Sequence, residues 1–518
     1  MKILSVADIT AWEKGTVTIQ KLAPAELMER AANALFQAIQ QSIGVESGGK
    51  HRSFVVLCGP GNNGGDGLAV GRMLYATGHE VSIFLLKQDS YSAENQINQQ
   101  RLREMDIPVY PFTPENQLFL PSKSIIIDAL FGCGLSRPLD DTWFGIVNQI
   151  NGAPNPVLSV DIPSGLFADK LSRTDNPIVQ ADITYTFACP KLNLLLPMYS
   201  AFTGEFKVLD IGLDKDLLDT LPSVYQYIQS EHIRTILRPL KKFSHKGTYG
   251  HACVAGGRYG SIGAIVLAGR AALKTGCGLV TAYIPACGYI VLQSAFPEAQ
   301  VQTDPTDTHI SLFPEQMMGY DAIGVGMGLG THRDSEKALL QLLEQFGATA
   351  RARKPSLLLD ADAINILAKN PDWHDLIPPH SILTPHLREL ERLLGPWSDD
   401  FEKLEKTSAW SARYQQIVVI KGANSAIVLP DGTIYFNSTG NPGMATGGSG
   451  DALSGIITSL LAQGYSPSDA ALAGVYLHGL AGDLAAQSIH PKSIIASDII
   501  EHLSGAWREI FGSSSVFS

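Results

Sequence analysis

The stretch Gly59-Pro-Gly-Asn-Asn-Gly-Gly-Asp-Gly67 follows directly on the apolar run Phe54-Val-Val-Leu-Cys58. A strand that leads into a helix through glycines presents backbone N–H groups and the positive end of the helix dipole to an anion. A second glycine-rich stretch, Gly447-Gly-Ser-Gly-Asp451, runs into the small and apolar segment Ala452-Leu-Ser-Gly-Ile-Ile457. Two such loops in one chain predict two phosphate-bearing ligands, or one kind of ligand that is bound twice.

Length and composition bound the class of protein. The 518 residues, 45% of them hydrophobic and 17% charged, suffice for two or three globular domains with a core in each. The 49 glycines favour an α/β enzyme with many tight turns. The net charge of −11 without a basic stripe argues against nucleic acid as a partner.

The expected location is the cytoplasm, away from membranes. No apolar stretch reaches the ~18 residues that a membrane helix needs, and the N-terminus lacks the pattern of a signal peptide. The six cysteines form no C-x-x-C pair, which favours a reducing compartment over a disulfide framework or a zinc site.

Short apolar runs separated by helix-length segments predict parallel sheets that are covered on both faces. A helix is predicted from Pro24 to Ile39. In the first half of the chain the expected strands are 53–58, 81–86, 124–128, 157–161 and 183–187. Ligands bind beyond the carboxyl ends of such strands, where the loops 59–67, 131–138 and 162–165 are expected to meet.

A second unit is expected to begin with the run His251-Ala-Cys-Val-Ala-Gly-Gly257. Its further expected strands are 279–284, 322–325, 357–360 and 417–420. We therefore predict two domains, 1–225 and 226–518, which share a pattern but no repeat. The charged segment 399–406 is interpreted as a solvated helix face.

The first glycine loop matches the dinucleotide fingerprint at Gly59, Gly61 and Gly64, which alone is a weak signal. Asn62 and Asn63 are unusual in that fingerprint. A carboxylate at Asp66 would repel a pyrophosphate unless it faces a ribose, a cation or the helix N-terminus; otherwise it caps the helix.

Asp128 and Asp161 each end an apolar strand. Either one alone is compatible with a role in capping a turn. Together with Asn63 and Ser164 they offer oxygen ligands for a hard cation, or groups that act on a substrate hydroxyl. Arg137 in the neighbouring loop either contacts a phosphate or is solvated.

Three motifs resemble the NAD(P)H-hydrate epimerase family: the nonamer with its two asparagines, Asp128-Ala-Leu-Phe-Gly-Cys-Gly-Leu135 and Val160-Asp-Ile-Pro-Ser-Gly165. The resemblance covers about residues 1–225. It implies an N-terminal Rossmann-like three-layer αβα domain that interconverts the R and S hydrates of NADH or NADPH at nicotinamide C6.

The resemblance also implies site residues. The hydrate would be bound by Asn62, Asn63, Gly64, Gly65, Asp66, Gly132, Cys133, Gly134, Leu135, Ser136, Arg137, Pro138 and Asp161. A potassium ion (K+) would be bound by Asn63, Asp128 and Ser164. We assign acid/base catalysis to Asp161, because the C6 hydroxyl must gain or lose a proton as it leaves and returns.

The second glycine loop suits phosphoryl transfer. Its glycine amides can stabilise charge on the transferred group, and Asp451 can accept a proton from an attacking hydroxyl. The alternative is a glycine-rich turn capped by that aspartate. His386 and Glu389 are three residues apart and share a face in a helix, while zinc is disfavoured without further ligands. Of Asp360 and Asp362, at least one is expected to cap a following helix.

These features resemble the ribokinase-like fold and, within it, the ADP- or ATP-dependent NAD(P)H-hydrate dehydratases. The motifs are Lys246-Gly-Thr-Tyr-Gly250, Gly324-Val-Gly-Met-Gly328, Leu359-Asp-Ala-Asp-Ala-Ile364 and Thr384-Pro-His-Leu-Arg-Glu389. The family more often has Pro-Gly where this chain has Leu387-Arg388. The resemblance covers about residues 230–510 and implies a C-terminal ribokinase-like αβα domain.

The implied reaction phosphorylates the C6 hydroxyl and then eliminates phosphate. ADP would be the co-substrate, giving AMP and phosphate, with a magnesium ion (Mg2+) organised by Glu389. The hydrate would meet Ala264, Gly328, His386 and Asp451. The nucleotide would meet Lys421, Gly422, Ala423, Asn424, Ser425 and Gly450.

The leading hypothesis is a bifunctional enzyme that repairs hydrated NADH and NADPH, with an epimerase half that supplies an S-specific dehydratase half. We expect small-molecule substrates and a homo-oligomer. The alternatives are a small-alcohol kinase with an accessory nucleotide-binding domain, an NAD-dependent dehydrogenase, and a non-enzyme in which the first half is a dimerising scaffold.

Overall fold

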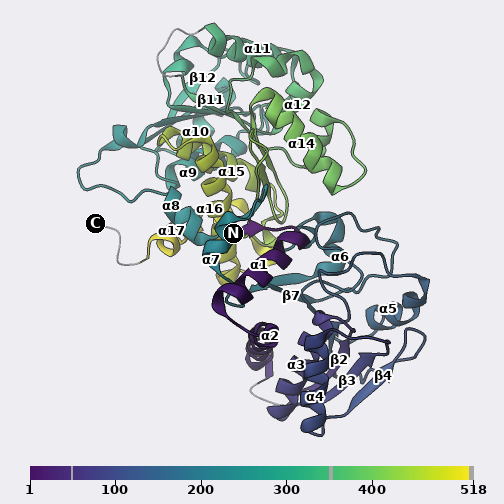
Figure 1. Cartoon of the computed structure of the whole chain (residues 1–518). Coiled ribbons are helices and arrows are strands. Elements are labelled where there is room, and N and C mark those ends of the chain that lie inside the picture. The colour runs from purple at the N-terminus through teal and green to yellow at the C-terminus, as the bar shows by residue number, and fades with distance from the viewer. Residues whose placement is uncertain (48–50, 349–353, 513–518) are drawn as a thin grey trace. The chain divides into compact units, whose positions relative to one another are not determined.

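The computed structural model describes residues 1–47, 51–348 and 354–512. The chain divides into two compact α/β units, Met1–Tyr225 and Gln226–Ser518 (Figure 1). Among the described residues, no helix combines the length and the apolar character that a membrane crossing needs.

The first unit is built on a seven-stranded sheet in which every strand pair is parallel. Its strands are β2 (Ser53–Cys58), β3 (Glu80–Leu86), β4 (Val109–Phe112), β5 (Ser124–Ala129), β6 (Val157–Val160), β7 (Ile183–Phe187) and β8 (Glu205–Leu209). The order β4-β3-β2-β5-β6-β7-β8 reverses direction between β2 and β5. The loops that follow these two strands therefore flank the switch point at which doubly wound sheets bind ligands.

Helices cover both faces of this sheet. They are α1 (Val6–Gln20), α2 (Pro24–Ser47), α3 (Asn62–Ala76), α4 (Ala93–Glu104), α5 (Phe144–Asn151), α6 (Ser200–Thr203) and α7 (Lys215–Thr220), with short 3₁₀ helices η1 (Asp141–Trp143), η2 (Leu192–Leu194) and η3 (Pro197–Tyr199). Alternate side chains of β2 enter different cores, Phe54 and Val56 on one side and Val55 and Leu57 on the other. The predicted three-layer αβα arrangement is confirmed.

The second unit contains a mixed sheet. Its strands are β9 (Tyr225–Tyr227), β10 (His251–Ala255), β11 (Leu279–Ile284), β12 (Gln300–Thr303), β13 (Ala322–Val325), β14 (Ser356–Leu359), β15 (Ile382–Leu383), β16 (Ile417–Ile420), β17 (Ala426–Val428) and β18 (Ile434–Phe436). They lie in the order β9-β18-β17-β16-β15-β14-β13-β10-β11-β12. Neighbours from β16 to β12 are parallel, whereas β16, β17 and β18 pair antiparallel.

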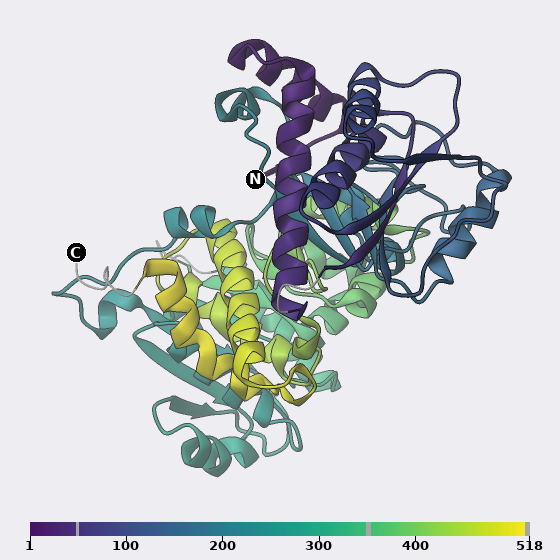
Figure 2. The same cartoon turned by 90° about the horizontal axis from the view of Figure 1, so that it is seen from below.

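Helices of the second unit pack on this sheet to form one large core. They are α8 (Ser230–Ile236), α9 (Gly263–Lys274), α10 (Tyr289–Ala295), α11 (Arg333–Ala348), α12 (Ala361–Lys369), α13 (Leu387–Leu394), α14 (Asp400–Tyr414), α15 (Ser449–Ala462), α16 (Pro467–Ser488) and α17 (Ala496–Phe511), with 3₁₀ helices η4 (Lys246–Tyr249), η5 (Ala286–Gly288), η6 (Glu315–Gly319), η7 (Pro371–Leu376), η8 (Pro442–Met444) and η9 (Pro491–Ser493). The yellow helices α16 and α17 lie side by side in both views (Figures 1 and 2). Helix α15 is buried along most of its length because it packs on α9, α16 and the sheet.

The expected strands of both units are present, but the structure adds elements that the apolar runs did not indicate. These include the edge strands β4, β8 and β12, the short strands β9 and β15 and the antiparallel hairpin β17–β18. The interpretation of 399–406 as a solvated face is wrong in part. Asp400 and Lys403 are buried and form an ion pair with each other on α14.

Candidate active sites

The first glycine loop joins β2 to α3, and at two of its glycines the backbone is too close for any side chain. A Cβ on Gly64 would lie 1.8 Å from the carbonyl oxygen of Gly59, and one on Gly59 would lie 1.8 Å from that of Leu130. The helix begins after Gly61 without a side-chain cap, and Asp66 lies inside it. Asp66 therefore does not cap the helix, which leaves its carboxyl group available to a ligand.

A cavity of about 860 Å³ lies at the switch point of the first unit. Its wall includes ten of the predicted hydrate-binding residues: Asn62, Asn63, Asp66, Gly132, Cys133, Gly134, Leu135, Ser136, Arg137 and Asp161. Gly64, Gly65 and Pro138 are not part of this wall. A Cβ on Gly65 would meet Met28 instead, because the two glycines serve the packing of α3.

Charged residues that the sequence did not indicate also line the cavity, among them Glu13 from α1 and Lys191 from the segment after β7. Neither belongs to a glycine loop or ends a strand. The one available signal for Lys191 is its place in Cys189-Pro-Lys191, four residues beyond a strand that ends at the same edge of the sheet.

The carboxylate of Asp161 is held in the cavity by an ion pair and by a backbone hydrogen bond. It follows β6 in the left-handed backbone region, with φ of +68°. Its Oδ1 lies 2.5 Å from Nζ of Lys191, and its Oδ2 accepts a hydrogen bond from Cys133 N at 3.0 Å. The Lys191 side chain is 1% exposed and also donates to the carbonyl of Phe187 at 2.9 Å. Asp161 and Lys191 thus form a buried, hydrogen-bonded ion pair.

Three acids of this cavity differ in the direction in which their pKa is shifted. Burial raises the pKa of Asp161, but the charge and hydrogen bond of Lys191 outweigh it and hold the pKa below its ordinary value. Burial and the charge of Asp161 raise the pKa of Glu13, with Lys191 opposing. Burial and the charges of Asp161 and Glu13 raise the pKa of Asp66 well above its ordinary value. The cavity therefore contains one carboxylate whose pKa is lowered beside two carboxyl groups whose pKa is raised.

Asp128 is not among the residues that line the cavity and is fully buried. Its oxygens accept hydrogen bonds from Ser159 Oγ at 2.8 Å, from Ser164 N at 2.9 Å and from Ser164 Oγ at 2.6 Å. Burial raises its pKa, and these hydrogen bonds offset that effect only in part. Among the described residues, no basic side chain forms an ion pair with Asp128.

Asn63 lies beside Gly132, and the amide of the preceding residue, Phe131, donates a hydrogen bond to Ser164 Oγ at 2.9 Å. A Cβ on Gly132 would lie 2.9 Å from Oδ1 of Asn63, so a side chain there would displace the amide. The buried Nδ2 of Asn63 has no hydrogen-bond partner. A buried carboxylate that is paired with no basic side chain of the described residues, together with nearby hydroxyl and amide oxygens, suits a hard cation such as K+.

In the second unit, the second glycine loop leads into the first turn of α15. Gly448, with φ of +90°, is the residue before the helix, and Asp451 lies in its first turn. A Cβ on Gly450 would lie 3.4 Å from Nζ of Lys421. Lys421 follows β16 and forms an ion pair with Oδ1 of Asp360 at 2.7 Å. The glycine loop, Asp451 and Lys421 therefore meet at the carboxyl edge of this sheet.

Asp360 is buried and organises this edge rather than capping α12. Its Oδ2 accepts a hydrogen bond from Ser454 Oγ at 2.7 Å, and its side chain makes no cap bond. Asp362 accepts from Gly330 N at 2.7 Å. Asp360 stands at the position before α12, but the expectation that one of these aspartates caps the helix with its side chain is wrong, because their oxygens accept from Lys421, Ser454, Gly330 and Asn365 instead.

Asp451 has an environment suited to a base. Burial and the negative charges of Asp360 and Asp362, partly opposed by Lys421, raise its pKa to about 6. Nearby, burial lowers the pKa of His478 to about 4, and its Nε2 lies 3.2 Å from Ser449 Oγ.

The residues expected to meet the hydrate lie around the same edge. Gly328, with φ of +62°, packs so closely on Ala264 that a Cβ there would lie 3.2 Å from that methyl group. His386 begins α13, and its Nδ1 accepts from the amide of Glu389 while the buried Glu389 carboxylate accepts from the amide of His386. The pair forms a capping box, as their spacing on one face predicts.

The segment expected to meet ADP is a tight turn after β16. Ser425 Oγ accepts a hydrogen bond from Gly422 N at 3.2 Å and donates to its carbonyl at 3.0 Å. Gly422 and Ala423 are exposed, and Lys421 N donates to the carbonyl of Pro385 beside His386. The turn is therefore continuous with the His386 loop.

Comparison with known families divides the chain in the same way. Residues 252–504 match the family described as NAD(P)H-hydrate dehydratase, and residues 24–193 match the YjeF-related protein N-terminus. A bifunctional NAD(P)H-hydrate repair enzyme of Moorella thermoacetica is 34% identical over 97% of this chain and 97% of its own length. The enzyme of the same name from Escherichia coli is 34% identical over 96% of this chain and 92% of its own.

Solved structures also resemble the second half. The ADP/ATP-dependent NAD(P)H-hydrate dehydratase of Bacillus subtilis, co-crystallised with ATP and Mg2+, is 29% identical with a TM-score of 0.47. It covers 55% of this chain and 98% of its own length. A ribokinase-like superfamily protein of Enterococcus faecalis is 25% identical with a TM-score of 0.48, over 56% of this chain and 98% of its own.

Proposed function

The chain belongs to the family of bifunctional NAD(P)H-hydrate repair enzymes, and we propose that its two chemistries are centred on Asp161 and Asp451. The first unit is the epimerase and the second the ADP/ATP-dependent dehydratase. The observation that carries the proposal is the opposite tuning of these two aspartates: Lys191 lowers the pKa of Asp161, whereas acidic neighbours raise that of Asp451 to about 6.

In the epimerase unit, epimerisation needs both a proton donor and a proton acceptor. The C6–O bond breaks as the N1 lone pair forms an N1=C6 iminium, and a protonated carboxyl group gives its proton to the departing oxygen. Asp66, whose pKa is raised, is the proposed donor, and ionised Asp161 takes a proton from the water that returns to the opposite face of C6. Lys191 is a positioning residue that keeps Asp161 ionised.

We assign the oxygen cluster of Asn63, Asp128 and Ser164 to K+. The support is the fully buried Asp128 carboxylate, which has no basic partner among the described residues, and the amide oxygen of Asn63 beside Gly132. A monovalent cation there would balance the buried charge and fix the loop that carries Gly132. The test is a comparison of thermal stability in K+ and in Li+, with Asp128→Asn expected to remove the difference.

In the dehydratase unit, Asp451 is the proposed base for phosphoryl transfer. It takes the proton of the C6 hydroxyl as that oxygen attacks the terminal phosphorus of the nucleotide. The amides of Gly447 to Gly450 and the α15 dipole stabilise charge on the transferred group. The C6–O bond then breaks with loss of phosphate and of the C5 proton, which restores the C5=C6 double bond.

We propose ADP rather than ATP as the co-substrate, bound by the turn of residues 421–425 and by Gly450. The positive charge of Mg2+ on its phosphates would be balanced by the carboxylates of Asp360, Asp362 and Asp451. The negative charges of Asp360 and Asp362 raise the pKa of Asp451, so a cation beside the three would relieve their repulsion. Glu389 is engaged in the capping box, so its expected contact with Mg2+ stays a prediction. Parallel recovery assays with ADP and ATP decide between the nucleotides.

The assignment is tested by separating the two activities. Asp451→Asn is expected to abolish the nucleotide-dependent return of reduced-nicotinamide absorbance while the R and S hydrates still interconvert. Asp161→Asn is expected to stop interconversion while the S hydrate is still dehydrated. Chromatography of the epimers and absorbance give the two readouts.

Exposed aspartates provide matched controls. Asp175→Asn in the first unit and Asp431→Asn in the second remove a carboxylate of the same kind outside the proposed sites. Both should retain both activities. Equal loss of both activities in Asp161→Asn or Asp451→Asn would overturn the assignment of the chemistries to separate aspartates.

The cytoplasmic location is proposed because all six cysteines are free. The expectation of a homo-oligomer without nucleic-acid or membrane partners stays a prediction, which light scattering and binding measurements on the purified chain test.

A further inference from the structure

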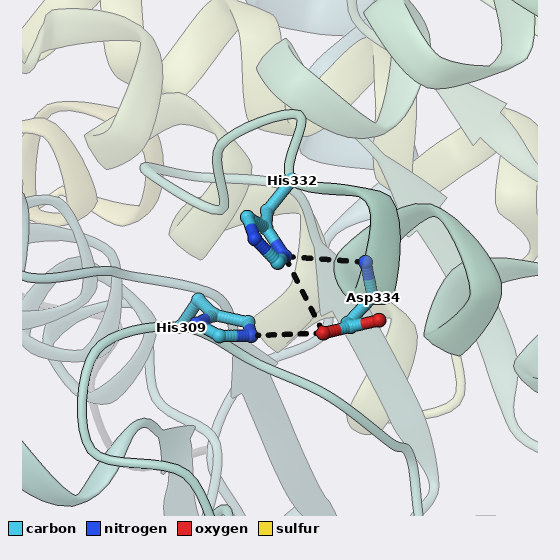
Figure 3. Close-up of side chains that lie close together, drawn as sticks. All are labelled: His309, His332 and Asp334. Atoms are coloured by element: carbon cyan, nitrogen blue, oxygen red, sulfur yellow. Dashed lines mark hydrogen bonds and ion pairs between the residues drawn. The ribbon is translucent and has the colours of Figure 1, made fainter.

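Three potential metal ligands converge in the second unit at a place that neither proposed active site uses. His309 lies in the loop after β12, His332 directly precedes α11, and Asp334 lies in the first turn of that helix. The side chains point toward one another (Figure 3). Their ligand atoms all lie within 4.8 Å of one another, which no other such group of His, Cys, Asp or Glu in the described residues achieves.

The distances suit a small metal ion. Nε2 of His309 lies 3.5 Å from Oδ2 of Asp334, and Nδ1 of His332 lies 3.6 Å from the same oxygen. Ligands held about 2.0–2.1 Å from a tetrahedral ion are about 3.3 Å apart. Two edges of the cluster therefore come within a few tenths of an ångström of a tetrahedral edge.

The His309 ring is oriented as metal ligands are. Its Nδ1 lies 3.1 Å from Thr308 Oγ1, which fixes one side of the ring by a hydrogen bond. Its Nε2 is buried, makes no hydrogen bond and faces the Asp334 carboxylate. A lone pair aimed at an anion is unfavourable unless a cation or a proton lies between them.

The loop that carries His309 is held by hydrogen bonds within the loop and by one to α11. Asp304 is 2% exposed and accepts backbone hydrogen bonds from Thr306 and from Ser311. Ser335 Oγ, next to Asp334, donates to the carbonyl of Ile310, next to His309, at 2.8 Å. The loop is thus closed by Asp304 and is joined to the start of α11 beside the cluster by the Ser335–Ile310 hydrogen bond.

We propose that His309, His332 and Asp334 bind a divalent first-row transition metal ion such as Zn²⁺, which clips the loop after β12 to the start of α11. Two imidazoles and one carboxylate favour this class over Mg2+, which prefers oxygen ligands. Nδ1 of His332 exchanges its hydrogen bond from Asp334 N for the ion. Lys337 lies 3.7 Å from Oδ1 of Asp334, which leaves Oδ2 for the metal.

The test is calorimetric titration of the chelator-treated full chain with Zn²⁺, in excess Mg2+ so that hard-cation sites are occupied. One ion per chain is expected at this site. His309→Ala and Asp334→Asn should weaken its binding at least about tenfold. The matched control is His490→Ala, which removes an exposed histidine of the same unit.

Two further readouts keep the test independent of activity. Co²⁺ in place of Zn²⁺ should give the visible absorption of a four-coordinate site in the wild type and in His490→Ala, but not in His309→Ala. Zn²⁺ should raise the unfolding temperature of the wild type by several degrees and leave that of folded Asp334→Asn unchanged. No binding by the wild type, or equal Zn²⁺ affinity in the wild type and His309→Ala, would overturn the proposal.

Discussion

At the residue scale, Lys191 determines the charge state of the epimerase cavity. It is almost completely buried, yet its ammonium is paired with Asp161 and bonded to the Phe187 carbonyl. The charge of Asp161 raises the pKa of Lys191 against the effect of burial, so the lysine stays cationic. Removing one member of such a pair leaves the other buried without compensation.

Lys191→Met is therefore expected to move the acid limb of the epimerase pH profile to higher pH. Without the lysine, burial raises the pKa of Asp161, and the carboxylate form persists only at higher pH. At the acid end the rate of epimer interconversion should fall about a hundredfold. Rates measured by chromatography across pH test this, with exposed Lys207→Met as the control. An unshifted limb would contradict the role given to Lys191.

The ionised carboxylate of Asp451 lowers the free energy of unfolding of the second unit. Its folded pKa of about 6 lies above the value of an exposed aspartate, so its ionisation opposes folding once the pH rises through about 6. Asp451→Asn should raise the free energy of unfolding by about 2 kcal/mol at pH 8. The gain should shrink as the pH falls below 6 and vanish near pH 4.

Urea unfolding of the wild type and Asp451→Asn at several pH values provides the measurement. The exposed Asp431→Asn serves as the control for a changed net charge. A gain that is independent of pH would show that ionisation of Asp451 is not its source.

Asp128 and Asp161 are predictable from sequence because an apolar run that ends in aspartate marks the carboxyl edge of a buried strand. Glu13 and Lys191 are not. Glu13 lies on a helix about 150 residues before its neighbour Asp161 in the chain, and only the folded topology brings the two together. The proximity of His386 and Glu389 is also predictable from sequence, because residues three apart lie on the same face of a helix.

At the element scale, the junction of β2 and α3 sets the shape of the first site. The helix starts close to the end of the strand because Gly59 and Gly64 have no side chains. The space that a Cβ of either residue would need is occupied by backbone atoms of Leu130 or Gly59. Glycine is required at both positions because other backbone atoms lie too close for a Cβ, and not because the φ of either residue is positive.

Gly64→Ala is expected to destabilise the first unit by about 2–3 kcal/mol, because its Cβ would lie 1.8 Å from a backbone oxygen that cannot move freely. Gly61→Ala is the matched control, since a Cβ there meets nothing within 4 Å and φ is −88°. It should cost less than about 1 kcal/mol. Denaturant unfolding compares the two variants, and equal costs would refute the packing argument.

Three of the strands that the sequence did not indicate share a physical cause. Strands β15, β17 and β18 contain only two or three residues each, too few to display a period. On α14, Asp400 and Lys403 resemble a solvated pair by composition, but their spacing directs both toward the core. Charge content alone therefore does not reveal which face of a helix is buried.

At the scale of the whole molecule, each unit has its own hydrophobic core. The large cluster around α9 and α15 contains only residues of the second unit, and the two clusters that flank β2 contain only residues of the first. Domains with separate cores can unfold as separate cooperative units.

Calorimetry of the full chain should therefore show two transitions that respond to different changes. ADP at a hundred times its dissociation constant should stabilise the dehydratase unit by about 2.7 kcal/mol and raise one transition. Gly64→Ala should lower the other transition. If ADP or Gly64→Ala shifts both transitions together, the units unfold as one and the prediction is wrong.

The left-handed backbone of Asp161 affects how any substitution there must be interpreted. Aspartate and asparagine tolerate a φ of +68° far better than alanine does, because their short polar side chains bond to nearby backbone. An alanine variant would combine a conformational penalty with the loss of the carboxylate, so a drop in rate would overstate the chemical contribution. Routine alanine scanning would therefore mismeasure this site, whereas asparagine changes the charge and preserves the turn.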